Sequence, residues 1–256
     1  MQPNNYKVNG KRVCNPVGWF LSEKYDGMKA RWIDGKLLTR SGLALHPPEW
    51  FVEMLPKKSN IEGELYLGKN TFHKTAGLRT TSISGDVDWK QVTYYVFDLI
   101  DYEKTWLERQ GKLKKIYPKN SKHICVVEWK EVERASDVES ALESVTGQGG
   151  EGVVLANPWG VYEDGHVDQI LKYKKMRDKE AIVTGYNFTG QRLESLNVRD
   201  PHGGQVFKIG GGFSVKDRYG FEKKYPVGCT VTYLYEVLYP TGKPRAPIFK
   251  GVRVDL

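Results

Sequence analysis

The chain has 256 residues, of which 39% are hydrophobic and 12% aromatic, and its formal net charge is +8. This length allows one large domain or two modest ones with real cores, and the composition excludes an intrinsically disordered chain. No apolar run reaches the length of a membrane span, and residues 1–20 lack the long apolar segment of a secretory signal. We therefore expect a cytoplasmic protein with no membrane partner, while an exported mature form or a viral host-cell compartment stays open.

The cysteines and the distribution of charge narrow the functional classes further. Cys14, Cys125 and Cys229 are odd in number, far apart and in no Cys-x-x-Cys pair, which argues against a disulfide framework and against a zinc site. Residues 181–256 hold 11 Lys and Arg against 6 Asp and Glu, a difference of +5, whereas residues 1–180 hold 28 against 25, a difference of +3. A basic C-terminal third with interleaved aromatic residues suits a polyanionic partner, the alternative being an ordinary solvated surface.

The first half of the chain has the pattern of antiparallel strands. A strand over 17–20 leads to Lys24, a second strand spans 29–33, the pair Asp34-Gly35 predicts a hairpin turn, and a third strand spans 37–39. Two prolines precede a short predicted helix over 49–55. A strand over 61–66 carries Glu62 and Glu64, which are two residues apart and therefore point to one face. Residues 93–100 predict a further strand.

The pattern changes near residue 180. Before it, we expect a lysine-rich helix over 104–116, a strand over 124–129, a helix opened by the capping box Ser136-Asp137-Val138-Glu139, and strands over 151–155 and 171–175. After it, glycine turns separate short strands over 181–188, 193–198, 206–213 and 229–238. This regular spacing predicts a small all-β barrel, with a domain boundary near residues 176–180.

Lys24 is the candidate nucleophile, in the stretch Ser22-Glu23-Lys24-Tyr25-Asp26-Gly27-Met28-Lys29. A lysine amine attacks phosphorus only when it is neutral, so cationic neighbours or burial must lower its pKa, and a small residue beside it lets a triphosphate approach. Nucleotidyl transfer also needs carboxylates for a metal, cations for the phosphates and an aromatic face for the base. The sequence supplies these as Glu64 and Glu151, as Arg40, Lys29, Lys172 and Lys174, and as Phe97. Taken singly, Lys24 could be a solvated lysine before a turn and Phe97 a core residue.

Six motifs follow one another across 150 residues, and their order carries more information than any one of them. They are Lys24-Tyr25-Asp26-Gly27, Thr39-Arg40-Ser41-Gly42, Glu62-Gly63-Glu64-Leu65, Val96-Phe97-Asp98-Leu99, Glu151-Gly152-Val153-Val154 and Leu171-Lys172-Tyr173-Lys174. This order resembles the covalent nucleotidyltransferase superfamily and, within it, the ATP-dependent DNA ligases, above all the minimal ligases of bacteria and viruses. The resemblance implies an α+β fold: a nucleotidyltransferase domain of ATP-grasp-like antiparallel sheets over 1–178, then a small OB-fold β-barrel over 179–256.

The resemblance also implies roles for individual residues. Lys24 becomes the lysyl-AMP and Phe97 stacks on adenine. Two departures from the family pattern are Lys29, where the family usually has arginine, and Glu62, where it often has aspartate; lysine keeps the charge but lacks the planar fork of arginine. The implied nucleotide-binding residues are Glu23, Asp26, Gly27, Lys29, Arg40, Glu64, Phe97, Lys172 and Lys174; the implied metal ligands are Glu64, Glu151 and Asp26; the implied contacts to DNA phosphate, or for closure of the OB domain on ATP, are Arg40, Arg245, Lys250 and Arg253.

The implied activity is the sealing of 5′-phosphate/3′-hydroxyl nicks in double-stranded DNA by a monomer that uses ATP and Mg²⁺ or Mn²⁺ and serves DNA replication, repair or recombination. Because the OB domain must face ATP in one step and DNA in the next, we expect a rotation about residues 176–180, with loops near Arg79 and residues 216–224 on the DNA. The alternatives are an ATP-dependent RNA ligase, an mRNA-capping guanylyltransferase, or a non-catalytic nucleic-acid-binding module of the same fold.

Overall fold

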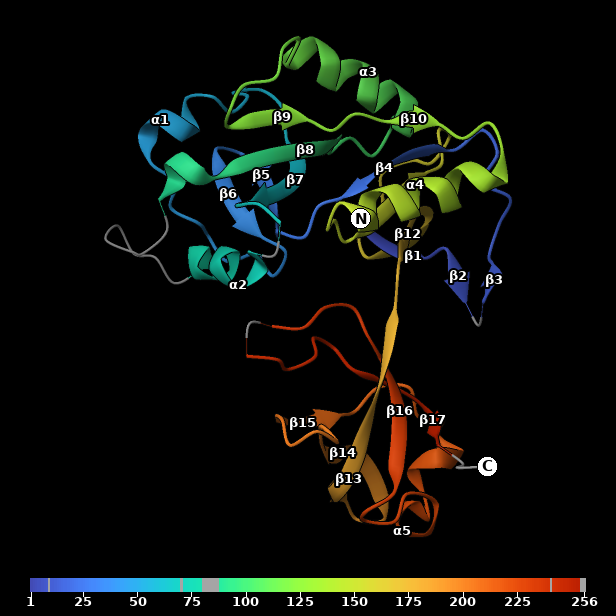
Figure 1. Cartoon of the computed structure of the whole chain (residues 1–256). Helices are drawn as coiled ribbons and strands as arrows, with labels where there is room; N and C mark the ends of the chain where they lie inside the picture. Colours follow the sequence, from blue (N-terminus) through green and yellow to red (C-terminus); the bar gives the residue numbers. More distant parts are fainter. Residues whose placement is uncertain (9, 70, 80–87, 240, 254–256) are drawn as a thin grey trace. The chain divides into compact units, whose positions relative to one another are not determined.

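A computed structural model describes residues 1–8, 10–69, 71–79, 88–239 and 241–253. The chain divides into two compact units, Met1–Lys174 and Lys175–Leu256 (Figure 1). Strand β12 (His166–Lys174) ends the first unit and strand β13 (Arg177–Thr189) begins the second. The division precedes the boundary expected at 178/179, because residues Arg177 to Ile182 of β13 already pair with a strand of the second unit. Within the described ranges, no helix is long and apolar enough to cross a membrane.

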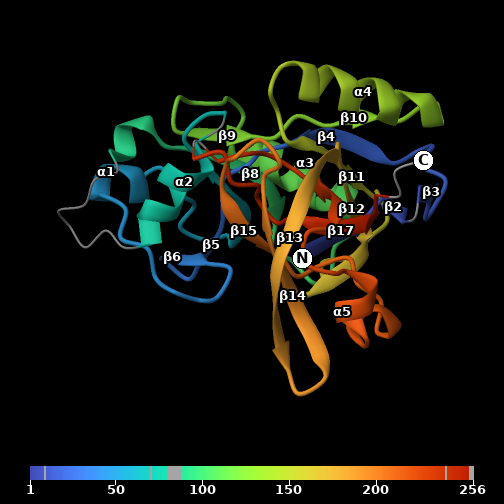
Figure 2. The same cartoon turned by 60° about the horizontal axis from the view of Figure 1, so that its bottom comes forward.

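The first unit contains two five-stranded sheets, and the first of them carries Lys24. Its strand order is β1-β12-β11-β4-β10, antiparallel except that β1 runs parallel to β12. One face packs against helix α4 (Figure 2). Leu21, Val153 and Leu155 lie in the hydrophobic core between them. The bounds are β1 (Gln2–Asn5), β4 (Phe20–Lys24), β10 (Lys130–Glu131), β11 (Gly152–Ala156) and α4 (Ala135–Gly147).

The second sheet has the order β6-β5-β7-β8-β9 and its own hydrophobic core. Met28, Leu65 and Tyr94 are buried on one face, where side chains of helices α1 and α3 also enter the core. The predicted turn at Asp34-Gly35 has φ of 48° and 77°, the left-handed conformation that a two-residue hairpin loop requires. The bounds are β5 (Met28–Ile33), β6 (Lys36–Thr39), β7 (Ile61–Tyr66), β8 (Thr93–Leu99), β9 (Ile124–Val126), α1 (Glu49–Val52) and α3 (Trp106–Ile116).

The second unit is a curled sheet with the strand order β15-β14-β13-β16-β17. Several short elements complete the first unit. A bridge between Gly211, just after β15, and Ile248 of β17 brings the two edges of that sheet together, as in a small barrel. The short elements are β2 (Lys7–Val8), β3 (Lys11–Arg12), α2 (Phe72–Thr75), η1 (Ala76–Arg79) and η2 (Trp89–Gln91); the second unit has β14 (Arg192–Arg199), β15 (Val206–Ile209), η3 (Lys216–Arg218), α5 (Phe221–Lys224), β16 (Thr230–Tyr235) and β17 (Ile248–Val252).

Several local predictions differ from the structure. The strand expected over 17–20 is β4 at Phe20–Lys24, the helix expected over 49–55 ends at Val52, and the strand expected over 206–213 ends at Ile209. Helix α4 begins at Ala135, one residue before the predicted capping box, because the carboxylate of Asp137 accepts the backbone N–H groups of Glu133 and Arg134 at 3.1 and 2.8 Å. Strand β17 was not predicted, because it is a short edge strand that contains Gly251 and has Phe249 as its one inward aromatic anchor.

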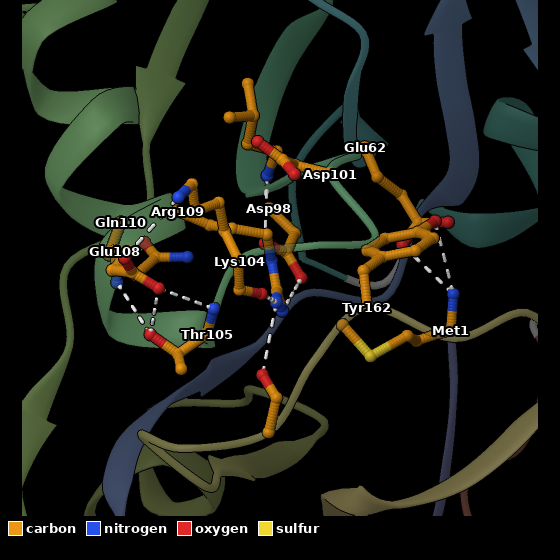
Figure 3. A network of polar contacts seen from close by, with 12 residues as sticks. Met1, Glu62, Asp98, Asp101, Lys104, Thr105, Glu108, Arg109, Gln110 and Tyr162 are labelled. Carbon is orange, nitrogen blue, oxygen red and sulfur yellow. Dashed lines mark hydrogen bonds and ion pairs between the residues drawn. The ribbon is translucent and has the colours of Figure 1, made fainter.

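A buried ion pair joins the second sheet to helix α3 (Figure 3). The guanidinium of Arg109 donates to both carboxylate oxygens of Asp98 in β8, at 2.7 and 2.9 Å, and both side chains are almost completely buried. A further Arg109 nitrogen donates to the carbonyls of Lys104 at 2.7 Å and of Gly160 at 3.1 Å. Gly160 lies in the loop between β11 and β12, so this one side chain connects the two sheets.

Arg109→Leu should therefore lower the free energy of unfolding by about 3–5 kcal/mol, because it leaves the buried carboxylate of Asp98 without a counterion. Lys112→Leu on the same helix is the matched control: the Lys112–Asp101 pair is partly exposed, and its loss should cost about 1 kcal/mol or less. Urea unfolding followed by tryptophan fluorescence measures both. Equal costs for the two substitutions would contradict this role of Arg109.

Candidate active site

Lys24 is the last residue of β4, and the strand register aligns it with other candidate residues. Gly152 of β11 lies directly between Lys24 of β4 and Lys174 of β12. Residues aligned across a sheet project from the same face, and so do residues two apart along a strand. Lys24, Lys172 and Lys174 therefore share the face of the sheet opposite to helix α4.

Glu151 connects two of these lysines. Its Oε2 accepts from Nζ of Lys24 at 2.7 Å, and its Oε1 lies 2.5 Å from Nζ of Lys174. Burial raises the pKa of Glu151, but the two lysines outweigh burial and bring that pKa below its ordinary value. The residue after it must be glycine, because a Cβ at Gly152 would lie 2.3 Å from the carbonyl oxygen of Tyr173. The close approach of β11 to β12 thus delivers the carboxylate of Glu151 to both amines.

The pKa of Lys24 differs from the expectation. A lowered pKa was predicted, but the structure raises it: burial lowers the pKa of Lys24, and the carboxylates of Glu151, Glu64 and Asp26 more than reverse that effect. The three acids expected to hold a metal ion thus lie close enough to Lys24 to raise its pKa. Without substrate, this amine is therefore protonated at neutral pH and paired with Glu151.

The second sheet supplies the opposite wall of the site. Glu64 of β7 pairs across the sheet with Lys29 of β5 and Tyr95 of β8, on the face away from the hydrophobic core. The backbone N–H of Gly27 donates to Oε1 of Glu64 at 3.1 Å, and a Cβ at Gly27 would lie 2.2 Å from the carbonyl oxygen of Leu65. Burial raises the pKa of Glu64 to about 7, with Glu151 adding to this and Lys24 and Lys29 opposing it.

Lys29 forms an ion pair with Glu62, the buried acid two residues before Glu64. Its Nζ lies 2.7 Å from Oε1 of Glu62 and 5.8 Å from the ring centroid of Phe97. Glu62 also lies 3.4 Å from the amino group of Met1, which in turn lies 3.3 Å from the hydroxyl of Tyr162 (Figure 3). The two departures from the family pattern, Lys29 and Glu62, are thus partners of each other. Phe97 is partly exposed beside Lys29 and stays out of the core cluster of this sheet, so it is available to a ligand.

Other predicted residues do not join this cluster. Glu23 aligns with Val153 on the face of the first sheet that packs on α4, opposite to Lys24. Arg40 is exposed in the turn after β6. The remaining three belong to the second unit: Lys250 lies 3.9 Å from Asp178, Arg253 contacts Glu180, and the backbone of Arg245 bonds to Val237. The side chain of Arg79 lies outside the described residues.

The predicted metal ligands do not form a closed site by themselves. Among the described residues, no group of three or more His, Cys, Asp or Glu is arranged to hold a metal ion. Glu64 and Glu151 nevertheless lie close enough to Lys24, and to each other, to affect one another's pKa. Two carboxylates suit Mg²⁺, which commonly takes one or two from the protein and completes its shell with water and substrate phosphates.

Sequence reasoning did not identify Arg109 or Tyr162. Arg109 could have been found, because Trp106, Arg109, Gln110 and Leu113 are the buried residues of α3 and follow helical spacing, so a charged side chain stands on an apolar stripe. Tyr162 lies in the loop between β11 and β12, and no sequence motif or periodicity distinguishes it as a site residue. Its position beside Glu62 depends on the packing of the two sheets.

Comparisons with known proteins add to this geometry. A family model described as an ATP dependent DNA ligase domain matches residues 5–174, and one described as a DNA ligase OB-like domain matches residues 188–253. A DNA ligase of Haemophilus influenzae is 36% identical over 233 residues, 89% of this chain and 84% of that protein. A structure from a study of minimal Lig E DNA ligases matches with a TM-score of 0.84 and 31% identity, covering 99% of this chain and 100% of that one. A Chlorella virus DNA ligase-adenylate, at 22% identity and a TM-score of 0.56, covers 99% of this chain and 97% of its own and shows likeness of fold alone.

The raised pKa of Glu64 can be measured directly. In metal-free protein, the Glu64 carboxyl should titrate near pH 7, so that it gains its negative charge as pH rises through neutrality. Glu151→Gln should lower this pKa, because it removes a neighbouring negative charge and leaves Lys24 in place. Carbon-13 NMR of labelled glutamate, with Glu64→Gln to assign the signal, gives both values. An ordinary pKa near 4.5 in the unsubstituted protein would contradict the described burial of this carboxyl.

Proposed function

Because the chain belongs to the family of ATP-dependent DNA ligases, we propose that it seals 5′-phosphate/3′-hydroxyl nicks in duplex DNA through a covalent adduct of AMP with Lys24. One observation supports this site above all: Glu151 joins Lys24 to Lys174 on one sheet, while the second sheet presents Glu64, Lys29 and Phe97. These residues would provide a nucleophile, acids, phosphate-binding cations and an aromatic face to one substrate.

In the first step, Nζ of Lys24 attacks the α-phosphorus of ATP, a phosphorus–nitrogen bond forms, and the bond to pyrophosphate breaks. Lys24 must lose a proton to react, and its amine starts protonated beside Glu151. Lys172 and Lys174 project from the same face and would contact the α-phosphate as its charge is redistributed. Glu64 and Glu151 would hold a divalent cation, which would stabilise phosphate charge and offset the acids that raise the pKa of Lys24.

In the second and third steps, AMP passes to DNA and leaves. The 5′-phosphate oxygen of the nick attacks the phosphorus bonded to Nζ of Lys24. The phosphorus–nitrogen bond breaks, the lysine amine leaves and takes up a proton, and a pyrophosphate linkage joins AMP to the DNA. The 3′-hydroxyl then attacks the 5′-phosphorus, AMP departs, and the strand is closed. Phe97 would stack on adenine through all three steps, and the exposed Arg40 would contact the 5′-phosphate. Lys24 is a reactant in the first two steps only.

The second unit would supply contacts to the DNA backbone. In the segment from η3 to α5, Arg218 is committed to the fold, because its guanidinium donates to the carbonyls of Leu193, Glu194 and Gly210. Lys216 and Lys223 are exposed and would meet phosphates instead. A rotation of this unit between the ATP and DNA steps would have to use Lys175 and Met176, since β13 is already paired from Arg177 onward.

The covalent intermediate gives the first test. Enzyme stripped of bound AMP with pyrophosphate, then incubated with α-labelled ATP and Mg²⁺, should give a labelled band at the mass of the protein on a denaturing gel. Lys24→Ala should give no band, because the phosphorus–nitrogen bond cannot form. A chase with nicked DNA should move the label off the protein and yield sealed strands.

The same gel separates the alternatives. A band formed from GTP in place of ATP would favour a guanylyltransferase, and a band that chases only onto nicked RNA would favour an RNA ligase. Absence of any band with either nucleotide would leave a non-catalytic binding module and contradict the proposed mechanism.

DNA binding should be independent of sequence and steeply dependent on salt, because contacts to phosphates release counterions. Replacing Lys216 and Lys223 together by glutamine should reduce the slope of log K against log salt by about 2. Fluorescence anisotropy of a labelled nicked duplex between low and physiological salt measures this slope. Lys36→Gln, an exposed lysine at the start of β6, is the control, and an unchanged slope in the double variant would place the contacts elsewhere.

A further inference from the structure

Three tyrosines form an aromatic cluster beside the candidate nucleophile. The ring of Tyr25 is stacked on that of Tyr95, with centroids 3.8 Å apart and an angle of 14° between planes. Tyr66 meets both rings edge-on, at centroid distances of 5.4 Å from Tyr25 and 5.7 Å from Tyr95. Tyr25 directly follows Lys24, while Tyr66 and Tyr95 lie on the second sheet, in β7 and β8.

This tyrosine cluster is separate from the hydrophobic core. Tyr94, the neighbour of Tyr95 in β8, is completely buried in the core, and successive residues of a strand point to opposite faces. Tyr95 aligns with Glu64, so the cluster lies on the face of the second sheet that carries the site. Burial raises the pKa of Tyr66 to about 12 and that of Tyr25 and Tyr95 above its ordinary value, which keeps the phenols neutral near Glu23.

The cluster lies where the chain crosses from one sheet to the other. Lys24 ends β4 in the first sheet and Met28 begins β5 in the second, which leaves three residues for the crossing. Two contacts anchor these three residues to the second sheet: Tyr25 through its ring, and Gly27 through its hydrogen bond to Glu64. The backbone of Lys24 is thus fixed from one side by strand pairing with β11 and from the other by the tyrosine cluster.

We infer that Tyr25, clamped by Tyr66 and Tyr95, is a positioning residue that fixes the backbone of Lys24 for in-line attack on the α-phosphorus and for release of AMP to DNA. The inference rests on the proposed function of Lys24. The aromatic rings would restrict the motion of residues 25–27, because one stacked pair and two edge contacts oppose rotation of this segment. The tyrosine hydroxyls are not required for this effect. A misplaced amine slows transfer even where the substrate is still bound.

Because Lys24 reacts in the first two steps and not in the third, the inference predicts a selective defect. Loss of the clamp should slow formation of the labelled adduct and its transfer to a nick. It should leave sealing of a nick that already carries AMP on its 5′-phosphate nearly unchanged. A merely structural role for the tyrosines would instead lower all three steps together.

The experiment compares Tyr25→Leu, Tyr66→Leu and Tyr25→Phe in the full-length chain, after removal of bound AMP with pyrophosphate. Rapid-quench measurement of adduct formation from α-labelled ATP gives the first rate, and sealing of synthetic pre-adenylated nicked DNA gives the third. Tyr25→Leu should slow adduct formation about tenfold, the size expected for loss of one or two aromatic contacts. Tyr25→Phe keeps the ring and should react within about twofold of the unsubstituted protein.

Tyr239→Leu is the matched control, because Tyr239 is an exposed tyrosine of the second unit, outside the cluster, and it should leave every rate unchanged. If Tyr25→Leu does not fold, Tyr66→Leu carries the test, since it removes both edge contacts and leaves the stacked pair in place. Adduct formation at the unsubstituted rate in both leucine variants would overturn the inference, as would an equal loss in sealing of pre-adenylated DNA. Absence of adduct from the unsubstituted protein would instead overturn the proposed function.

Discussion

The two sheets of the first unit must be held together for the site to form, and the buried ion pair of Asp98 with Arg109 contributes to this. Asp98 belongs to the second sheet, and Arg109 reaches from α3 to the carbonyl of Gly160 in a loop of the first sheet. Neither partner touches the candidate nucleophile. The site exists only because Lys24 and Glu64, on different sheets, come close enough to influence each other, and that proximity follows from the packing.

Charge balance is the second constraint on the site. Lys24 and Lys174 share the carboxylate of Glu151, and Lys29 neutralises the buried Glu62, so in the absence of substrate the charges are satisfied within the protein. Such pairing avoids the large cost of burying lone charges. It also means that the protein alone does not make Lys24 a nucleophile. Reactivity would arise when substrate and cation enter and compete for these acids.

The sequence was most informative where chemistry and periodicity agree. The order of the motifs predicted the fold class and singled out Lys24, Glu64, Phe97, Glu151 and Lys174 as candidates. The structure places four of these in strands, where side chains alternate between faces, and Glu151 directly before β11. The pKa of Lys24 could not be derived, since it depends on acids brought together only by folding. Glu23 was expected to bind the nucleotide, but it directly precedes Lys24 in β4. Its side chain therefore points to the opposite face of the sheet. Arg109 shows that a charge on an apolar helical stripe is a readable signal.

The alignment of Lys24, Gly152 and Lys174 across three neighbouring strands also limits how this protein can evolve. Side chains alternate along a strand, so deleting or inserting one residue within β4, β11 or β12 would turn the amine of Lys24, or that of Lys174, toward helix α4. Changes in chain length are therefore tolerable only in the connecting loops. Within a motif that lies in a strand, side-chain alternation constrains the number of residues between functional positions. The lengths of the loops between motifs are under no such constraint.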